Sequence, residues 1–149
     1  MGNILILYAS STGNTELMAD AIEKYLRKID YQVIIKTFDY DPIDVHDLLK
    51  YDGLLIGTYT WDDGELPYEV EDFYEELEDV DLTGKSVGVF GSGDSFYDTF
   101  GGAIDLLADR LQKCGADLLE ERLKVDLTPK LEDIKRCELF TQKLIDRIE

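Results

Sequence analysis

The hydrophobic positions of this chain follow two different spacings. Short apolar runs predict buried strands, and these runs lie at 3–8, 32–38, 53–57, 86–90 and 118–125. Apolar residues at helical spacing predict amphipathic helices, and these stretches lie at 17–29, 70–77, 104–111 and 134–148. Strands that read as nearly continuous apolar runs and alternate with helices are typical of a parallel sheet with both faces covered.

The pattern predicts an α/β fold in which a doubly wound, five-stranded parallel sheet carries helices on both faces. No repeat or linker interrupts the chain, so residues 1–149 are expected to form one domain. In such a sheet, ligands bind beyond the carboxyl ends of the strands, where the strand order reverses. The loops after the first, third and fourth strands are therefore the places to look for a functional site.

Charge changes this picture of an ordinary globular chain. The sequence holds 15 basic and 33 acidic residues, which gives a net charge of −18. A surface of this sign disfavours binding to a nucleic-acid backbone or to an anionic membrane, and it favours a basic protein partner. Partner binding through charge is thus expected to involve another protein, with no nucleic acid and no membrane.

Other sequence features indicate the cellular compartment and exclude several kinds of site. The apolar segment at 4–9 is too short for a signal peptide, and no run is long enough to span a membrane, so a cytoplasmic protein is expected. Cys114 and Cys137 have no spacing typical of a disulfide framework or a metal site, and we expect two buried free thiols. His46, the only histidine, has no Cys or His neighbour, so neither a metal site nor a catalytic residue is expected.

The loop after the first strand surrounds one glycine with hydroxyl groups. It leads directly into the first helix, and its residues are Ser10, Ser11, Thr12, Gly13, Asn14 and Thr15. Backbone N–H groups and the helix dipole converge at such a junction, which favours a phosphate dianion. The loop lacks the Gly-Lys-Ser/Thr ending of a nucleoside-triphosphate loop and the three glycines of a dinucleotide fingerprint. A Ser/Thr-rich helix N-cap is the alternative interpretation.

The loops after the third and fourth strands carry aromatic residues among polar ones. The loop at 58–67 contains Trp61, the only tryptophan, which could stack on a planar ligand or simply cap the core. The loop at 91–102 begins like a dinucleotide fingerprint, but Phe96 stands where the third glycine is required. A plain glycine-rich turn is the alternative there. Together, one anion-binding loop and two aromatic loops at one sheet edge fit a phosphorylated flat heterocycle.

At this point the sequence resembles a flavodoxin over its whole length, from Asn3 to the last helix. The matching motifs are the phosphate loop, the pair Thr60-Trp61, and the run 91–95 followed by Tyr97. The fifth strand leads to the last helix without the long insertion of long-chain members, so the resemblance is to the short-chain type. It implies the strand order 2-1-3-4-5.

The resemblance also implies one non-covalent FMN and a role as a low-potential one-electron carrier that passes through a semiquinone. The first loop would hold the phosphate, and Trp61 and Tyr97 would cover the inner and outer faces of the flavin ring. The residues implied to bind FMN are Ser10, Ser11, Thr12, Gly13, Asn14, Thr15, Thr58, Tyr59, Thr60, Trp61, Asp62, Ser92, Gly93, Asp94, Tyr97, Thr99 and Gly101.

One position departs from the pattern of many short-chain relatives, in which a glycine follows the tryptophan. Here that position is Asp62. A residue with a Cβ resists glycine-like backbone conformations, so the peptide that would turn toward the singly reduced flavin is expected to turn less readily. The semiquinone is then expected to be less stabilised than in relatives with glycine.

Acidic residues dominate one stretch of the chain. Residues 62–81, called the acidic segment below, hold eleven carboxylates and no Lys or Arg. At about 10 Å in a water-like dielectric, each carboxylate opposes an added negative charge by roughly 0.4 kcal/mol, or about 20 mV. We therefore expect the reduction potential for the second electron added to the flavin to be shifted well negative. We also expect the acidic rim to attract a basic redox partner.

The resemblance points to a ferredoxin/flavodoxin reductase as donor, to a haem monooxygenase, desaturase or similar enzyme as acceptor, and to a monomer. Two alternatives share the fold. A phosphoacceptor response regulator would need paired acids where Ala9-Ser10 stands and an aspartate in place of Thr58. A small FMN-dependent NAD(P)H/quinone oxidoreductase stays open as the second hypothesis, although the chain has little spare length for another substrate site.

Overall fold

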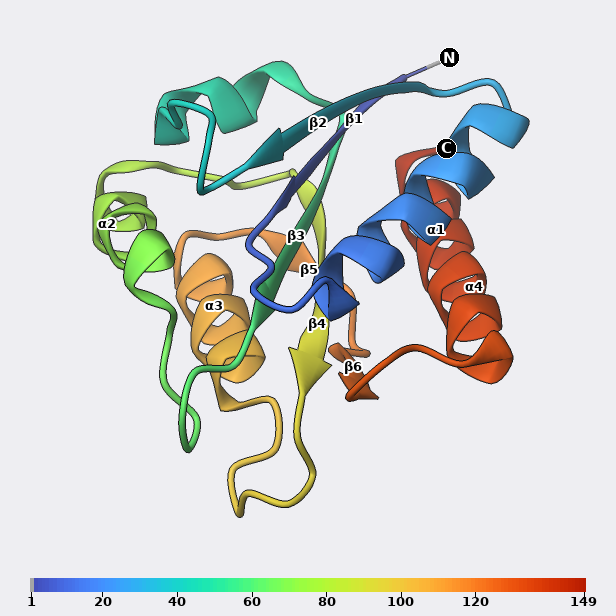
Figure 1. Cartoon of the computed structure of the whole chain (residues 1–149). Helices are drawn as coiled ribbons and strands as arrows, with labels where there is room; N and C mark the ends of the chain where they lie inside the picture. The colour runs from blue at the N-terminus through green and yellow to red at the C-terminus, as the bar shows by residue number, and fades with distance from the viewer. Residues whose placement is uncertain (1) are drawn as a thin grey trace.

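A parallel sheet of six strands forms the centre of the computed structural model, which describes residues 2–149 (Figure 1). The strands are β1 (Asn3–Tyr8), β2 (Gln32–Thr37), β3 (Gly53–Tyr59), β4 (Ser86–Gly93), β5 (Asp117–Leu118) and β6 (Leu123–Asp126). The order is β2-β1-β3-β4-β5, with β6 also paired to β4. The predicted order 2-1-3-4-5 is confirmed, and the order reverses between β1 and β3.

The fifth strand is interrupted, so the prediction of one continuous strand at 118–125 is wrong. Val87 pairs with Leu118, and Phe90, three residues later, pairs with Leu123. Between these two pairs, the segment from Leu118 to Leu123 advances five residues while β4 advances three. The segment therefore contains extra residues that are not paired with β4, and the exposed Glu120 is one of them.

The central strands extend further than their apolar runs. β3 continues to Tyr59 and β4 to Gly93, because Thr58 pairs with Gly91 and Tyr59 with Ser92 beyond the hydrophobic part of each strand. This added pairing carries the ends of β3 and β4 together to the carboxyl edge of the sheet. Thr58 and Gly91, which were predicted to begin loops, are therefore held in place by strand pairing.

Helices cover both faces of the sheet, as predicted. Helices α1 (Asn14–Lys28) and α4 (Leu131–Ile148) lie on one side in Figure 1, and α2 (Tyr68–Glu76) and α3 (Gly102–Lys113) lie on the other. Two short 3₁₀ helices, η1 (Val45–Lys50) and η2 (Leu77–Asp79), complete the elements.

Each face of the sheet has its own hydrophobic core. Under α1 and α4, the core includes Met18, Ile22 and Phe140, all fully buried. Under α2 and α3, it includes Phe73 and Leu107. The apolar face of each helix is thus buried against the sheet, and this burial is the main stabilising term available to a chain of this size.

The two cysteines are free, and they differ in burial. Cys137 is buried, as predicted, and burial raises the pKa of its thiol to about 12. Cys114 is only half-buried, because it lies at the end of α3, where its Sγ donates a hydrogen bond to the Leu77 carbonyl at 3.0 Å. Within residues 2–149, no helix has the length and apolar character needed to cross a membrane.

Buried tyrosines predict a loss of stability in alkali. Burial raises the pKa of Tyr8 and Tyr31 to about 12, and the hydrogen bond from Tyr31 to Glu149 adds to the shift. Because an unfolded tyrosine titrates near pH 10, their contribution is complete below about pH 10 and is lost as pH rises toward about 12. Urea unfolding across this range should show a falling free energy of unfolding.

Substitution of single tyrosines tests this assignment. Tyr31→Phe should reduce the alkaline loss, whereas Tyr40→Phe, at a side chain that is 88% exposed, should leave it unchanged. Equal alkaline losses in both variants and in the wild type would show that Tyr31 does not contribute.

Candidate functional site

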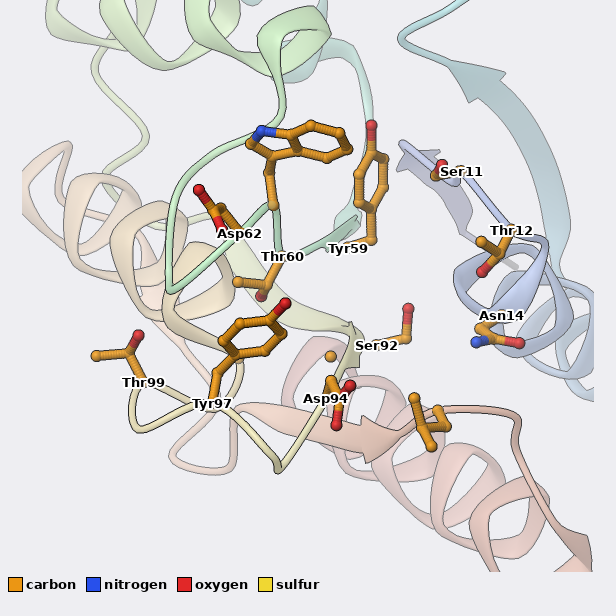
Figure 2. Close-up of a pocket in the computed structure, with 14 residues that line it drawn as sticks. Ser11, Thr12, Asn14, Tyr59, Thr60, Asp62, Ser92, Asp94, Tyr97 and Thr99 are labelled. Atoms are coloured by element: carbon orange, nitrogen blue, oxygen red, sulfur yellow. The ribbon is translucent and has the colours of Figure 1, made fainter.

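A pocket of about 260 Å³ opens at the carboxyl ends of β1, β3 and β4, where the strand order reverses (Figure 2). All three predicted loops contribute to its walls. The lining residues are Ser11, Thr12, Asn14, Tyr59, Thr60, Trp61, Asp62, Ser92, Gly93, Asp94, Tyr97, Thr99, Gly101 and Leu127. The pocket combines hydroxyl groups, acidic groups and aromatic rings in one concave surface, as small-molecule sites do.

The first loop opens into the amino end of α1. Gly13 occupies the N-cap in the left-handed region, with φ of 96°, and open space surrounds the position of a Cβ there. The Ser10 hydroxyl accepts a hydrogen bond from the Glu16 N–H at 3.1 Å. Ser11 and Thr12 line the pocket. The helix dipole and the hydroxyl groups thus favour an anion at this end of the pocket.

Four of the predicted site residues lie beside the pocket without lining it, namely Ser10, Gly13, Thr15 and Thr58. Thr15 and Thr58 are fully buried. The Thr15 hydroxyl forms a 2.7 Å hydrogen bond with the Ser92 hydroxyl, and the Thr58 hydroxyl donates to the Tyr59 carbonyl at 2.8 Å. The Thr15 side chain therefore connects α1 to β4 beneath the pocket.

The second loop is a tight hairpin turn. Trp61 and Glu65 exchange two backbone hydrogen bonds of 2.8 Å, so that residues 62–64 form the turn. Asp62 has φ of 49°, in the left-handed region that favours glycine, although it carries a Cβ. Aspartate tolerates this region better than most residues do, because its short polar side chain can form local hydrogen bonds. The expected weaker stabilisation of the singly reduced flavin stays a prediction.

Carboxylate side chains hold the first part of the third loop. The Asp94 carboxylate accepts the Phe96 N–H at 2.9 Å, and Asp126 accepts the Ser95 N–H at 3.0 Å and its hydroxyl at 2.5 Å. These bonds from Ser95 lower the pKa of Asp126. The ring of Tyr97, which lines the pocket, meets Phe96 edge-on with 5.8 Å between ring centroids.

A direct contact joins the two aromatic loops. Asp63 accepts hydrogen bonds from the Thr99 N–H at 3.2 Å and from the Thr99 hydroxyl at 2.5 Å, and these bonds lower the pKa of Asp63. Behind the third loop, the Lys124 ammonium donates to the Phe100 carbonyl at 3.2 Å and to Asp105 at 2.6 Å. The hydrogen bonds between Asp63 and Thr99 therefore fix the distance between the loops that carry Trp61 and Tyr97.

Leu127 is a pocket residue that the sequence interpretation missed. It follows β6 directly, adopts φ of 60°, and donates its N–H to the Gly93 carbonyl at 2.8 Å. The available signal was the end of the fifth strand, because all parallel strands end at the same edge.

The acidic segment runs from the pocket rim along α2 and η2. All of its carboxylates except that of Glu69 belong to exposed residues. Arg110, from α3, pairs with Glu78 at 2.9 Å. Asp62 lines the pocket, and Asp63 and Glu65 lie in the same hairpin. Negatively charged residues therefore lie along one side of the pocket opening.

Two features of the described residues fit a phosphorylated flat ligand. The Thr60 hydroxyl is buried beside the pocket and has no hydrogen-bond partner within residues 2–149. Trp61 is 56% exposed at the pocket wall, so its ring presents an aromatic surface that a flat ligand can cover. A doubly wound sheet with a hydroxyl-rich anion loop and two aromatic loops defines a flavodoxin-like site.

Known proteins of the same kind resemble this chain closely. The family model for flavodoxins matches residues 6–140. "Probable flavodoxin 1" of Bacillus subtilis is 43% identical over 143 residues, which are 95% of this chain and 89% of that protein. The chain belongs to the flavodoxin family, whose members are FMN-binding electron-transfer proteins and not enzymes.

Solved structures support the same assignment. Oxidised flavodoxin 1 from Bacillus cereus superposes with a TM-score of 0.92 at 40% identity, with 97% of each chain covered. A short-chain flavodoxin associated with a non-canonical PDU bacterial microcompartment superposes with a TM-score of 0.93 at 37% identity, with 100% of each chain covered. The predicted short-chain type is confirmed.

Proposed function

We propose that this chain carries single electrons at low potential between a reductase and acceptor enzymes. When bound, FMN supplies the one-electron redox chemistry, and the protein supplies binding, orientation and electrostatics. The observation that carries the proposal is the convergence of the anion-binding loop and both aromatic loops on one pocket. The exposed pocket edge favours electron transfer with a partner that docks there.

The residues have distinct proposed roles. The loop 10–15 receives the phosphate at the amino end of α1, where the dipole favours negative charge. Trp61 and Tyr97 provide the aromatic surfaces for the flavin ring, and the Thr60 hydroxyl gains a partner. Asp94 would meet the polar edge of the ring, together with the backbone near Ser92, Gly93, Thr99 and Gly101. Thr58 and Thr15 act from below, through the hydrogen bonds that shape the pocket floor.

The acidic segment is proposed to guide basic redox partners to the pocket rim. A ferredoxin/flavodoxin reductase is the expected donor, and haem monooxygenases, desaturases or similar reductive enzymes are the expected acceptors. Carboxylates at the rim raise the association rate with a basic partner, while an exposed ion pair adds little lasting affinity. Such rapid and short-lived binding suits a monomeric cytoplasmic carrier.

Reduction by a basic reductase tests this role. We expect the bimolecular rate constant to fall about tenfold or more when salt rises from about 10 mM to about 300 mM, because screening weakens attraction between surfaces. The variant with Asp62→Asn and Glu65→Gln should react more slowly at low salt. Asp30→Asn, at an exposed residue beyond the far end of α1, should not.

Stopped-flow measurement of flavin absorbance gives these rates. A rate that is independent of salt and of the rim carboxylates would contradict electrostatic docking. Steady oxidation of NADPH without any reductase would contradict the carrier role itself.

A further inference from the structure

Tyr59 forms a wall of the pocket between its two ends. It is the last residue of β3, is half-buried, and lines the pocket. Figure 2 shows its ring between Thr60 and Asp62 on one side and Ser11 and Thr12 on the other. The backbone of Tyr59 is placed by β4, but the direction of its ring depends on what holds the side chain.

A carboxylate outside the pocket lining holds that side chain. The Tyr59 hydroxyl donates to Glu69 Oε2 at 2.9 Å and lies 3.2 Å from Oε1. Glu69 is in the first turn of α2, where the helix dipole favours its negative charge. Hydrogen bonds to an ionised acceptor are stronger than those between neutral groups, so this contact can fix a ring that is only half-buried.

The phenol keeps its proton in this setting. Burial and the hydrogen bond to Glu69 both raise the pKa of Tyr59 well above its usual range. Partial burial and the nearby charge of Glu69 raise the pKa of Asp39. Tyr59 is therefore the donor and Glu69 the acceptor at neutral pH.

We propose that Glu69 is a positioning residue for the flavin site, which acts through the Tyr59 hydroxyl to hold the tyrosine ring as the wall between the anion-binding loop and the Trp61 hairpin. The proposal rests on FMN as the ligand of the pocket. Without the bond, the ring gains alternative rotamers, and ligand binding must then order it. Glu69 thus influences affinity although it does not line the pocket.

A double-mutant cycle on FMN binding tests the proposal. Tyr59→Phe and Glu69→Ala should each weaken FMN binding to the apoprotein by about threefold to tenfold, and the double variant should be no weaker than the worse single one. Glu69→Gln keeps an acceptor oxygen and should retain affinity within about twofold. Glu71→Ala, at an exposed residue in the same turn of α2, is the matched control and should have no effect.

Flavin fluorescence quenching gives the affinities, and the melting temperature of each apoprotein reports on the fold. Additive effects of the two single changes would overturn the proposal. So would an equal loss in Glu69→Gln and Glu69→Ala, because it would indicate an effect of charge and not of position. A lowered melting temperature with unchanged affinity would assign Glu69 a purely structural role. A wild-type apoprotein that does not bind FMN would overturn the proposed function as well.

Discussion

Replacing Gly91 with alanine is expected to destabilise the fold by about 3 kcal/mol or more. A Cβ at this position would lie 1.8 Å from the Thr58 carbonyl oxygen and 2.9 Å from the Ile104 side chain. Thr58 and Gly91 are paired residues of β3 and β4, so the carbonyl cannot move without breaking the sheet beneath the pocket. Urea unfolding of purified variants measures the loss.

Gly84→Ala provides the comparison. Gly84 has φ of 85°, but no atom lies within 4 Å of the position of its Cβ. Only backbone strain opposes the alanine, and the expected loss is about 1–2 kcal/mol. Equal losses in the two variants would show that β3 and β4 are not in close contact at Gly91.

Replacing Trp61 with alanine is expected to weaken FMN binding about tenfold to a hundredfold. Stacking of a flat ring on an aromatic side chain contributes roughly 1–3 kcal/mol. Because Trp61 is 56% exposed, its removal should change the stability of the apoprotein by no more than about 0.5 kcal/mol. Calorimetric titration of the apoprotein with FMN separates the two effects.

Two further variants define the origin of this loss. Trp61→Phe keeps an aromatic face and should recover most of the affinity, whereas Tyr40→Ala removes an 88% exposed ring outside the pocket lining and should have no effect. Wild-type affinity in Trp61→Ala would contradict the role of the hairpin as a wall of the flavin site.

Most of the fold could be predicted because its signals are local. The apolar run at 4–9 lies between the polar Asn3 and Ser10, and the run at 53–57 lies between Asp52 and Thr58, so each indicates a strand by itself. The interruption between β5 and β6 could not be predicted, because it comes from the register of the outer chain against β4. Register depends on contacts between residues distant in sequence, which a local pattern does not contain.

The candidate site shows a similar division. Topology alone brings the three loops to one edge, and thus places Ser11, Trp61 and Tyr97 around one pocket. The sequence does not predict the conformation of single residues at this edge. The Thr15 hydroxyl points inward to Ser92, and the Asp62 backbone is left-handed, because of contacts and turn geometry that form only in the folded chain.

A visible absorption spectrum of the purified protein during stepwise reduction, with the released flavin quantified afterwards, shows whether this chain is a one-electron FMN carrier. We expect one FMN per chain and two separate one-electron steps, the second at the more negative potential. A colourless protein that cannot be reconstituted with FMN would contradict this expectation, as would a flavin that accepts both electrons in a single step.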